Sequence, residues 1–332
     1  MKLILALALG ALIGFSTAQA GNLNERDDVK QFIDKMVSEH QFDKKQLQEW
    51  FSKTELKPKI IEAISRPAEK KLKWHEYRKI FVKPNRINKG VTFWNAHRDT
   101  LARAEKEYGV PAHIITAIIG VETRYGEHKG RYRVIDSLAT LGFDYPKRSK
   151  FFKSELEQYL LLVREENADP FSIKGSYAGA MGIPQFISSS YRHYAVDFDG
   201  DGIRDLWNNP VDAIGSVANY FKKHGWEAGG DVVISTKVTG DKYQTLVERG
   251  LKPHTALTEF SDHGLNFTAD TDNTQKASLI ELTQPASKEY WIALNNFYVI
   301  TRYNHSALYA MAAHQLSLEI KKARNTALNE AS

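Results

Sequence analysis

The stretch Pro111-Ala-His-Ile-Ile-Thr-Ala-Ile-Ile-Gly-Val-Glu-Thr-Arg-Tyr-Gly126 decides the fold. Proline suits the first turn of a helix and glycine suits its end, so the boundaries predict one helix over residues 111–125. Ile118 and Val121 lie on its apolar stripe, and Glu122 falls on the same stripe near the C-terminal end. The spacing therefore predicts a substantially buried carboxylic acid on a core helix.

Such a position suits acid catalysis. Burial and the negative end of the helix dipole both disfavour the ionised form, so we expect the pKa of Glu122 to be raised. A carboxyl that keeps its proton near neutral pH can protonate a glycosidic oxygen. Periodicity alone leaves the alternative open that Glu122 is structural and pairs with Arg124 or another cation.

A second segment, Gly175-Ser-Tyr-Ala-Gly-Ala-Met-Gly-Ile-Pro-Gln-Phe-Ile-Ser-Ser-Ser190, has little side-chain bulk around its glycines. Ser176 and Gln185 supply hydrogen-bonding groups, and Tyr177 and Phe186 supply ring faces. This mixture suits a sugar cleft, where rings stack and hydroxyls meet polar groups. Viewed alone, the segment is equally compatible with a tight turn between packed helices.

A third segment, Asp197-Phe-Asp-Gly-Asp-Gly-Ile-Arg-Asp205, matches the calcium loop of an EF-hand at positions 1, 3, 5, 6 and 9. Position 12 is Asn208 where a bidentate Glu is usual, so the loop either closes on Asp212 or binds weakly. An acidic surface turn without metal is the alternative. The expected calcium ligands are Asp197, Asp199, Asp201, Ile203 and Asp212.

A fourth segment, residues 296–309, is rich in aromatic and polar side chains. Tyr303, Asn304 and Tyr309 could line a cleft from a helix and the turn that follows it. An aromatic stripe at helical spacing is more often core than site, so this segment alone decides nothing.

The N-terminus has the three parts of a secretory signal: Met1-Lys2, an apolar run from Leu3 to Phe15, and a small-residue cleavage site ending at Ala20. The run is shorter than the roughly 20 residues that a membrane-spanning helix needs. No later segment stays apolar long enough to span. We therefore expect an exported, soluble, periplasmic protein.

The composition excludes several classes of protein. The 332 residues contain no cysteine, which rules out disulfides, thiol nucleophiles and the lipid-acceptor cysteine of a bacterial lipoprotein. The 42% hydrophobic content is enough for a large core in two or three lobes. The formal charge of +5 suits an acidic polymer, cell-wall glycan included, but no dense basic tract suggests nucleic acid.

Periodicity divides the chain. Polar helices occupy about 27–105, and the apolar helix 111–125 is followed by a second helix at about 150–167. Residues 231–238 and 277–282 read as strands of a small inserted β lobe. Helical periodicity returns at 289–304 and 308–323, so the C-terminus should pack against earlier helices.

In order and in sequence, four motifs resemble the lytic murein transglycosylase B family: Val-Glu-Thr-Arg-Tyr-Gly, Gly-Ala-Met-Gly-Ile-Pro-Gln-Phe, Asp-Phe-Asp-Gly-Asp-Gly and Val-Ile-Thr-Arg-Tyr-Asn. The resemblance covers roughly residues 30 to 320. It implies a mainly α (α+β) fold, with a lysozyme-like helical core, a flanking helical lobe and a small inserted antiparallel β lobe. The missing lipid-acceptor cysteine is a departure from the membrane-anchored members.

The resemblance also implies domains and roles. The expected domains are a signal peptide 1–20, a helical lobe 21–105 joined by 310–332, a core 106–229 and 286–309 with the calcium loop 197–212, and a β lobe 230–285. Glu122 is the expected sole acid/base, and calcium in the loop is structural, with no organic cofactor. The expected substrate-binding residues are Ser176, Gln185, Phe186, Tyr220, Tyr303, Asn304 and Tyr309.

The expected function is cleavage of peptidoglycan glycan strands, at the β-1,4 bond between N-acetylmuramic acid and N-acetylglucosamine, to give 1,6-anhydromuramic acid ends. Two alternatives stay open. A hydrolytic muramidase would use Glu122 with a second carboxylate that positions water. A non-catalytic scaffold would bind glycan without shortening it. Cell-wall synthesis or remodelling proteins are possible partners; no membrane anchor is expected.

Overall fold

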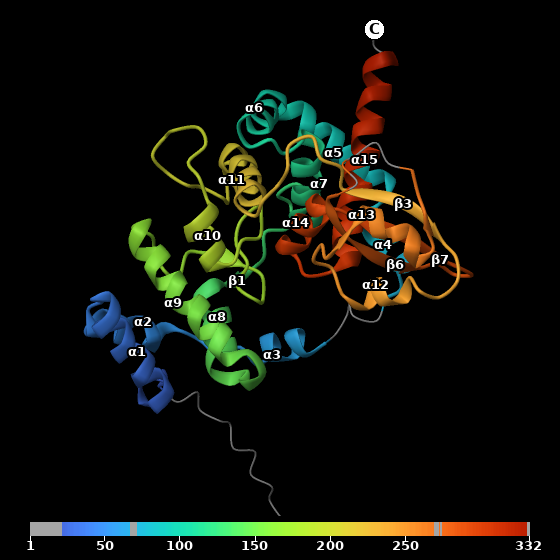
Figure 1. Ribbon diagram of the computed structural model, residues 1–332. Coiled ribbons are helices and arrows are strands. Elements are labelled where there is room, and N and C mark those ends of the chain that lie inside the picture. Colours follow the sequence, from blue (N-terminus) through green and yellow to red (C-terminus); the bar gives the residue numbers. More distant parts are fainter. Residues whose placement is uncertain (1–21, 67–71, 269–271, 273, 331–332) are drawn as a thin grey trace, which may run out of the picture. The chain divides into compact units, whose positions relative to one another are not determined.

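The computed structural model describes residues 22–66, 72–268, 272 and 274–330 (Figure 1). The predicted signal peptide, residues 1–20, lies outside this part of the chain. Two compact units are separated after Thr54.

The first unit is helical. Its elements are a 3-10 helix η1 (Leu23–Glu25) and the helices α1 (Asp27–His40) and α2 (Lys44–Lys53). Helix α2 begins after Asp43, whose carboxylate accepts a hydrogen bond of 2.7 Å from the backbone N–H of Gln46 and caps the helix. The rings of Phe32 and Phe51 meet edge to face, with centroids 5.9 Å apart, and join α1 to α2.

The second unit holds most of the helices and all of the strands of the described chain. Its helices are α3 (Pro58–Ser65), α4 (Trp74–Phe81), α5 (Pro84–Ala96), α6 (Arg98–Tyr108), α7 (Ala112–Thr123), α8 (Val134–Asp144), η2 (Pro146–Arg148), α9 (Ser149–Glu165), α10 (Ser188–Tyr194), α11 (Pro210–Lys223), α12 (Gln244–Glu248), α13 (Leu257–Phe260), η3 (Ser261–His263), α14 (Asn295–Tyr303) and α15 (Ala307–Glu330).

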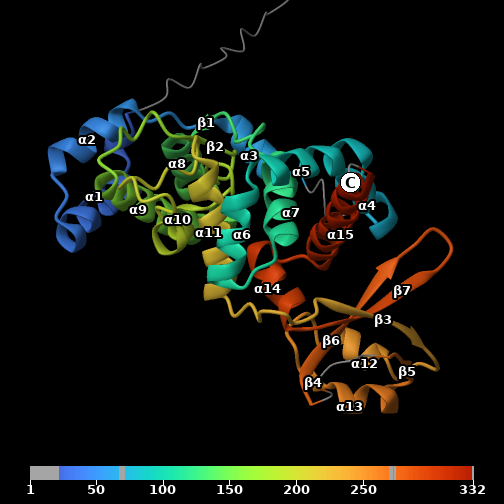
Figure 2. The ribbon, with the colours of Figure 1, turned by 90° about the horizontal axis from the view of Figure 1, so that it is seen from above.

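Helix α7 is the centre of the helical part. Helices α5, α6, α11 and α15 pack against it, and α15 also contacts α4 and α5 (Figure 2). Ile115, Ile118 and Ile119 are completely buried. The helix predicted over 111–125 is confirmed, and so is the packing of the C-terminal helix on earlier helices. Because neighbours enclose α7 on nearly all sides, the polar residues on it are few and their environment is strongly apolar.

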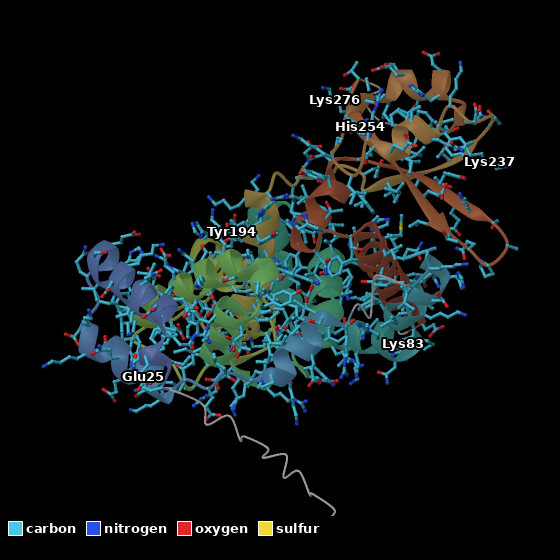
Figure 3. The ribbon with its side chains drawn as sticks, turned by 90° about the horizontal axis from the view of Figure 1, so that it is seen from below. Glu25, Lys83, Tyr194, Lys237, His254 and Lys276 are labelled. Atoms are coloured by element: carbon cyan, nitrogen blue, oxygen red, sulfur yellow. The ribbon has the colours of Figure 1, made fainter. Side chains whose placement is uncertain are left out.

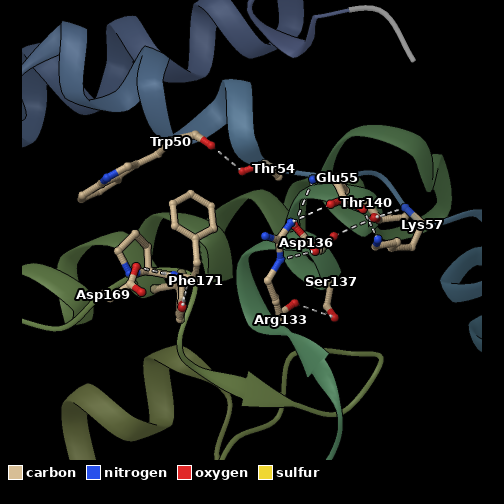
Figure 4. Close-up of polar contacts among 12 residues, drawn as sticks. Trp50, Thr54, Glu55, Lys57, Arg133, Asp136, Ser137, Thr140, Asp169 and Phe171 are labelled. Carbon is tan, nitrogen blue, oxygen red and sulfur yellow. Dashed lines mark hydrogen bonds and ion pairs between the residues drawn. The ribbon is translucent and has the colours of Figure 1, made fainter. Parts of the chain in front are cut away.

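A buried ion pair ties the beginning of the second unit to α8 (Figure 4). Asp136 is 2% exposed, and its carboxylate accepts hydrogen bonds of 2.7 and 2.9 Å from the Arg133 guanidinium. The same carboxylate accepts 3.0 Å from the backbone N–H of Glu55, and the Thr140 hydroxyl accepts 2.9 Å from that of Lys57. Side chains thus satisfy the backbone of an otherwise irregular segment.

Residues 233–293 build a five-stranded antiparallel sheet in the order β4-β6-β7-β3-β5. Its strands are β3 (Val233–Val238), β4 (Thr255–Ala256), β5 (Leu265–Asn266), β6 (Lys276–Thr283) and β7 (Lys288–Ala293). Ile292 lies opposite Ile234 on one side and Leu279 on the other. Leu246 and Phe260, from α12 and α13, join the apolar cluster on this sheet. The two strands predicted from sequence are confirmed.

The helix predicted from residue 289 is wrong over its first six residues, 289–294. Strand β7 occupies 288–293, and helix α14 begins only at Asn295. The reason is pairing with distant segments, since β7 hydrogen-bonds to β3 on one side and β6 on the other. Tyr290, Trp291 and Ile292 also have strand-favouring side chains. Pairing with distant strands here outweighs the helical spacing of the apolar residues. The domain boundaries given above stay a prediction.

Two short strands, β1 (Tyr132–Arg133) and β2 (Lys174–Gly175), form a separate antiparallel pair. This pair holds the start of the glycine-rich segment beside α8. The overall class, mainly helical with small antiparallel sheets, is the predicted one. No helix among the described residues has the length and apolar character that crossing a membrane requires.

Candidate active site

Glu122 lies in the last turn of α7 and is partly exposed, whereas nearly every other residue of that helix is buried. Its Oε1 accepts a hydrogen bond of 2.5 Å from the hydroxyl of Tyr309, which is 3% exposed. Tyr309 is in the first turn of α15, 187 residues away. Packing of α15 on α7 therefore brings a hydroxyl donor to the predicted catalytic carboxyl.

The charge of Glu122 acts on the pKa of two tyrosines, Tyr309 and Tyr303. Burial, and then the charge of Glu122, raise the pKa of Tyr309 well above its ordinary value. The same two causes, in the same order, raise the pKa of Tyr303. Both phenols therefore stay protonated and can donate hydrogen bonds. Among the described residues, Glu122 is the carboxylate that acts on both of them.

The glycine-rich segment is a compact turn with its backbone bridged to itself. Met181 pairs with both Gly175 and Phe186. A Cβ on Gly175 would lie 2.3 Å from the carbonyl oxygen of Ala180, so only glycine allows this approach. The Ser176 hydroxyl oxygen accepts hydrogen bonds of 3.2 and 3.0 Å from the backbone N–H groups of Ala178 and Ala180. Ser176 is thus fixed by the turn.

Gln185 has a left-handed backbone, with φ of +53°, which is uncommon outside glycine. Its side-chain amide donates to the carbonyl oxygens of Gly182 (3.0 Å) and Lys129 (3.3 Å). These bonds hold the side chain in one orientation. The amide oxygen is left to accept from another group, as the described contacts of Gln185 involve only its nitrogen.

An aromatic cluster joins the turn to the last helices. The ring of Tyr303 lies 5.9 Å from that of Phe186 and 4.8 Å from that of Tyr220, centroid to centroid. The Tyr303 hydroxyl donates 2.5 Å to the carbonyl oxygen of Pro184, and the Tyr220 hydroxyl donates 2.6 Å to that of Arg302. Burial is the main cause that raises the pKa of Tyr220 well above its ordinary value, so its hydroxyl is a donor as well.

Asn304 lies at the end of α14, is exposed, and has extended backbone. It follows Tyr303 directly and therefore stands at the margin of the cluster. The structure thus brings Glu122, Tyr309 and Tyr303 together, with Phe186 and Tyr220 next to Tyr303. Ser176 and Gln185 are held on the turn that carries Phe186.

The turn that follows Glu122 has unusual backbone. Arg124 and Tyr125 both have positive φ, +51° and +64°. The Tyr125 hydroxyl donates 2.7 Å to the carbonyl oxygen of Arg86 on α5, and the Arg86 guanidinium donates 3.2 Å to the carbonyl oxygen of Gly120 on α7. These reciprocal bonds hold two consecutive left-handed residues, whose cost is of order 1–3 kcal/mol each.

Two glycines make room for this contact. A Cβ on Gly90 would lie 2.6 Å from the Tyr125 hydroxyl, and a Cβ on Gly120 would lie 2.5 Å from it. Helices α5 and α7 therefore approach each other closely around one phenol group. We call Arg86, Tyr125 and these two glycines the Tyr125 clasp.

The acidic loop between α10 and α11 gathers carboxylates. One oxygen atom each from Asp197, Asp199 and Asp212 lies within 4.8 Å of the others. Asp212 is fully buried, and its two oxygens accept 2.7 and 2.9 Å from the backbone N–H groups of Phe198 and Asp205. Burial first, with the charges of Asp199 and Asp197 in addition, raises the pKa of Asp212. Hard oxygen donors crowded in this way suit a divalent cation.

Two other expected calcium ligands, Asp201 and Ile203, do not place a carboxylate in this group. The Asp201 carboxylate accepts 2.8 Å from the backbone N–H of Ile203 and is outside the three-carboxylate group. Ile203 has an exposed side chain, and only its carbonyl oxygen could bind a metal. The Asn209 side chain donates 2.7 Å to Asp199 and caps α11 through Val211. The loop therefore continues past Asn208 to Asp212.

Comparison with known proteins agrees with this arrangement. Residues 24–318 match the family described as Transglycosylase SLT domain. The chain is 45% identical over 313 residues to membrane-bound lytic murein transglycosylase B of Escherichia coli (strain K12), covering 92% of this chain and 85% of that protein. The chain belongs to the SLT-domain transglycosylase family.

Solved structures of relatives are similar over most of the chain. Soluble lytic transglycosylase SltB1 from Pseudomonas aeruginosa is 51% identical with a TM-score of 0.85, covering 90% of this chain and 99% of that one. Escherichia coli Slt35 in complex with calcium is 45% identical with a TM-score of 0.82, covering 92% and 96%. SltB3 from P. aeruginosa, in complex with NAG-anhNAM-pentapeptide, is 31% identical with a TM-score of 0.77, covering 88% and 79%.

The protein is therefore a peptidoglycan lytic transglycosylase with a lysozyme-like fold, as the resemblance of its motifs indicated. Sequence reasoning missed several residues of the site. Tyr77 of α4 is buried and lies close enough to Tyr309 to act on its pKa, but within its helix it is simply part of an apolar stripe. Arg86 was missed too, because a cation after a proline reads as a surface residue. The left-handed backbone of Arg124 and Tyr125 was missed as well, because Gly126 indicated only that the helix ends there.

Proposed function

We propose that Glu122 is the single acid/base of this transglycosylase and that it cleaves the β-1,4 bond between N-acetylmuramic acid and N-acetylglucosamine. The observation that carries the proposal is the contact between the Tyr309 hydroxyl and Glu122 Oε1 in the last turn of a buried helix. That contact holds the carboxyl beside two buried tyrosines, Tyr309 and Tyr303. A group held in this way is positioned for proton transfer.

In the first step, protonated Glu122 gives its proton to the oxygen of the glycosidic bond, and the bond between that oxygen and the anomeric carbon breaks. The N-acetylglucosamine leaves with a free hydroxyl. The substrate's own N-acetyl group supports the positive charge that develops on the anomeric carbon. No second carboxylate is required for this step.

In the second step, ionised Glu122 takes the proton of the muramic acid 6-hydroxyl while its oxygen bonds to the same anomeric carbon. The product is a 1,6-anhydro sugar, no water is consumed, and Glu122 is protonated again. The attack is intramolecular and gains from the proximity of its nucleophile. The Tyr309 hydroxyl stabilises the ionised carboxylate between the two steps.

The sugar-binding roles follow from the contacts of each residue. The amide oxygen of Gln185 and the hydroxyl proton of Ser176 can bond to substrate hydroxyls, and exposed Asn304 can do so at the margin. The rings of Phe186, Tyr220, Tyr303 and Tyr309 shape the apolar part of the cleft. The substrate is the glycan strand, in keeping with the NAG-anhNAM-pentapeptide bound to SltB3.

We propose calcium as a structural ion of the acidic loop. Asp197, Asp199 and Asp212 would hold it, with the Ile203 carbonyl and Asp201 as further candidate oxygens. Bound calcium would neutralise carboxylates that otherwise repel one another, and so stabilise the start of α11. The complex of Slt35 with calcium supports this assignment.

We also propose that the protein is exported to the periplasm through the signal pattern of residues 1–20. From the family resemblance we further propose domains at 21–105 with 310–332, 106–229 with 286–309, and 230–285. Cell-wall remodelling proteins are candidate partners there, since the substrate is the cell wall itself.

The test is mass spectrometry of purified peptidoglycan digested with the wild-type protein and with Glu122→Gln. We expect 1,6-anhydromuramic acid ends from the wild type and none from the variant, which keeps the shape of the side chain but has no proton to give. Circular dichroism should show the same fold in both. Free reducing ends would instead indicate hydrolysis, and substantial turnover by Glu122→Gln would refute the single-acid assignment.

A further inference from the structure

A small cavity lies where the N-terminus of α5 meets the turn after α7. Its volume is about 80 Å³, and none of its lining residues belongs to the cluster around Glu122. The lining side chains are Lys83, Asn85, Arg86, Lys89, Arg124, Tyr125 and Glu127. Four of these seven side chains carry a positive charge, so the cavity has a positive electrostatic potential.

The buried member of this set is Arg86, which is 5% exposed. Its guanidinium donates to the Gly120 carbonyl and lies 5.0 Å from the ring of Phe81. In the described part of the chain no carboxylate forms an ion pair with it. Burial, and then the charge of Arg124, lower the pKa of Arg86. A buried cation that faces a second cation in place of an anion is costly.

The other charges around the cavity do not compensate Arg86. Glu127 forms an ion pair with Lys89 at the exposed side, and these two charges offset each other. Lys83 is exposed at the start of α5 (Figure 3), and Arg124 is exposed after α7. Lys83, Arg86 and Arg124 therefore leave about three positive charges around one small space.

The backbone adds to this field. Helix α5 is 13 residues long, and no side chain caps its N-terminus. The positive end of its dipole faces the residues that line the cavity, which favours an anion there. Two guanidinium groups offer paired N–H donors that match the oxygens of a phosphate or a carboxylate.

We propose that this cavity binds a small oxyanion, with Arg86 as its buried anchor and with Lys83 and Arg124 as its outer contacts. The volume admits one group the size of a phosphate or a carboxylate, given that water occupies about 30 Å³ per molecule. Because Arg86 and Tyr125 also hold the turn after Glu122, a bound oxyanion would stabilise that turn. This inference does not depend on the proposed reaction of Glu122.

The experiment is isothermal titration calorimetry of the full protein with inorganic phosphate at constant ionic strength, with sodium chloride as background. The test variant is Lys83→Gln/Arg124→Gln, which leaves Arg86 and the core untouched. The matched control is Lys237→Gln/Lys276→Gln, which removes two exposed charges from the sheet (Figure 3). Thermal unfolding without phosphate checks that all three proteins are folded.

We expect one phosphate per chain, binding weakened about tenfold or more in the test variant, and unchanged binding in the control. A parallel titration with acetyl-Ala-Glu distinguishes a carboxylate from a phosphate as the source of the oxyanion. Binding of either probe that weakens only in the test variant supports the proposal. If neither probe binds, or if both variants or neither variant weaken the binding, the cavity is not an oxyanion site.

Discussion

The Tyr309 hydroxyl and Glu122 Oε1 lie 2.5 Å apart, although they come from helices at opposite ends of the catalytic part of the sequence. Glu122 closes α7 and Tyr309 opens α15. The carboxyl and its donor therefore keep their geometry only while these two helices stay packed. Mutations at this contact should affect the rate more than substrate affinity.

Tyr309→Phe removes the hydroxyl and keeps the ring. We expect kcat to fall on the order of 10- to 100-fold with little change in KM, because the lost bond stabilises the ionised carboxylate during the reaction. Since a donated bond favours the ionised form, its loss should also move the alkaline limb of the rate profile to higher pH. Anhydro-product assays across pH give both readouts. Tyr298→Phe, on α14, is the control; equal losses in the two variants would contradict a specific role.

Calcium should stabilise the protein through the acidic loop. An ion that binds only the folded state at 100 times its Kd adds about 2.7 kcal/mol to the free energy of unfolding. We expect Tm to rise with added calcium and to fall with a chelator. Asp199→Asn should reduce this response, whereas Asp262→Asn, an exposed carboxylate in the sheet region, should not. A calcium response that survives Asp199→Asn unchanged would exclude this loop as the site.

Two half-buried histidines predict acid sensitivity. Burial is the main cause that lowers the pKa of His113 and of His314 to about 4, from an ordinary value of 6.5. Above pH 6.5 both are neutral in the folded and unfolded states and cost nothing. As pH falls from 6.5 toward 4, these histidines become protonated in the unfolded chain but stay neutral in the folded chain. The free energy of unfolding therefore falls, by about 2 kcal/mol for each histidine.

Denaturant unfolding at pH 7.5 and 4.5 measures this decline. His314→Met should have a smaller difference between the two pH values than the wild type, and His305→Gln, at an exposed position, should behave as the wild type does. An unchanged difference in His314→Met would show that other groups cause the acid sensitivity.

Asp136→Asn tests the buried ion pair with Arg133. We expect a loss of about 2 kcal/mol in the free energy of unfolding, since the variant replaces the 2.7 Å ion pair of Arg133 with a neutral contact, while its 3.5 Å ion pair with Glu55 remains, and weakens the bond to the Glu55 backbone. Asp241→Asn, at an exposed turn, should cost less than about 0.5 kcal/mol. Urea unfolding of both variants provides the comparison; near-equal stabilities would mean that the pair contributes little.

Local signals explain what the sequence alone could predict. The helix around Glu122 has its proline, its glycine and its apolar spacing within 16 residues, and the prediction was correct to within two residues. The missing position-12 ligand pointed to Asp212 as one way to close the acidic loop, and the structure places Asp212 close to Asp197 and Asp199. Both features depend on neighbours in the sequence.

Long-range packing explains the rest. Strand β7 was read as helix because its partners, β3 and β6, act through sheet pairing that periodicity does not contain. The sequence offered Tyr309 as a possible cleft residue, and only the family resemblance made it an expected substrate contact; its bond to Glu122 spans 187 residues. Arg86 could not be recognised as buried, because nothing next to it in the sequence indicates that α7 covers it.

The Tyr125 clasp limits how this enzyme can be made more thermostable. Replacing a mid-helix glycine with alanine ordinarily stabilises a helix by about 1 kcal/mol, and Gly90 and Gly120 would be obvious choices for such engineering. Here the added methyl group would occupy the space of a phenol oxygen, 2.6 or 2.5 Å away. These two glycines leave the space that the Tyr125 hydroxyl fills. A glycine-to-alanine substitution, which stabilises most helices, would here force α5 and α7 apart beside the catalytic turn.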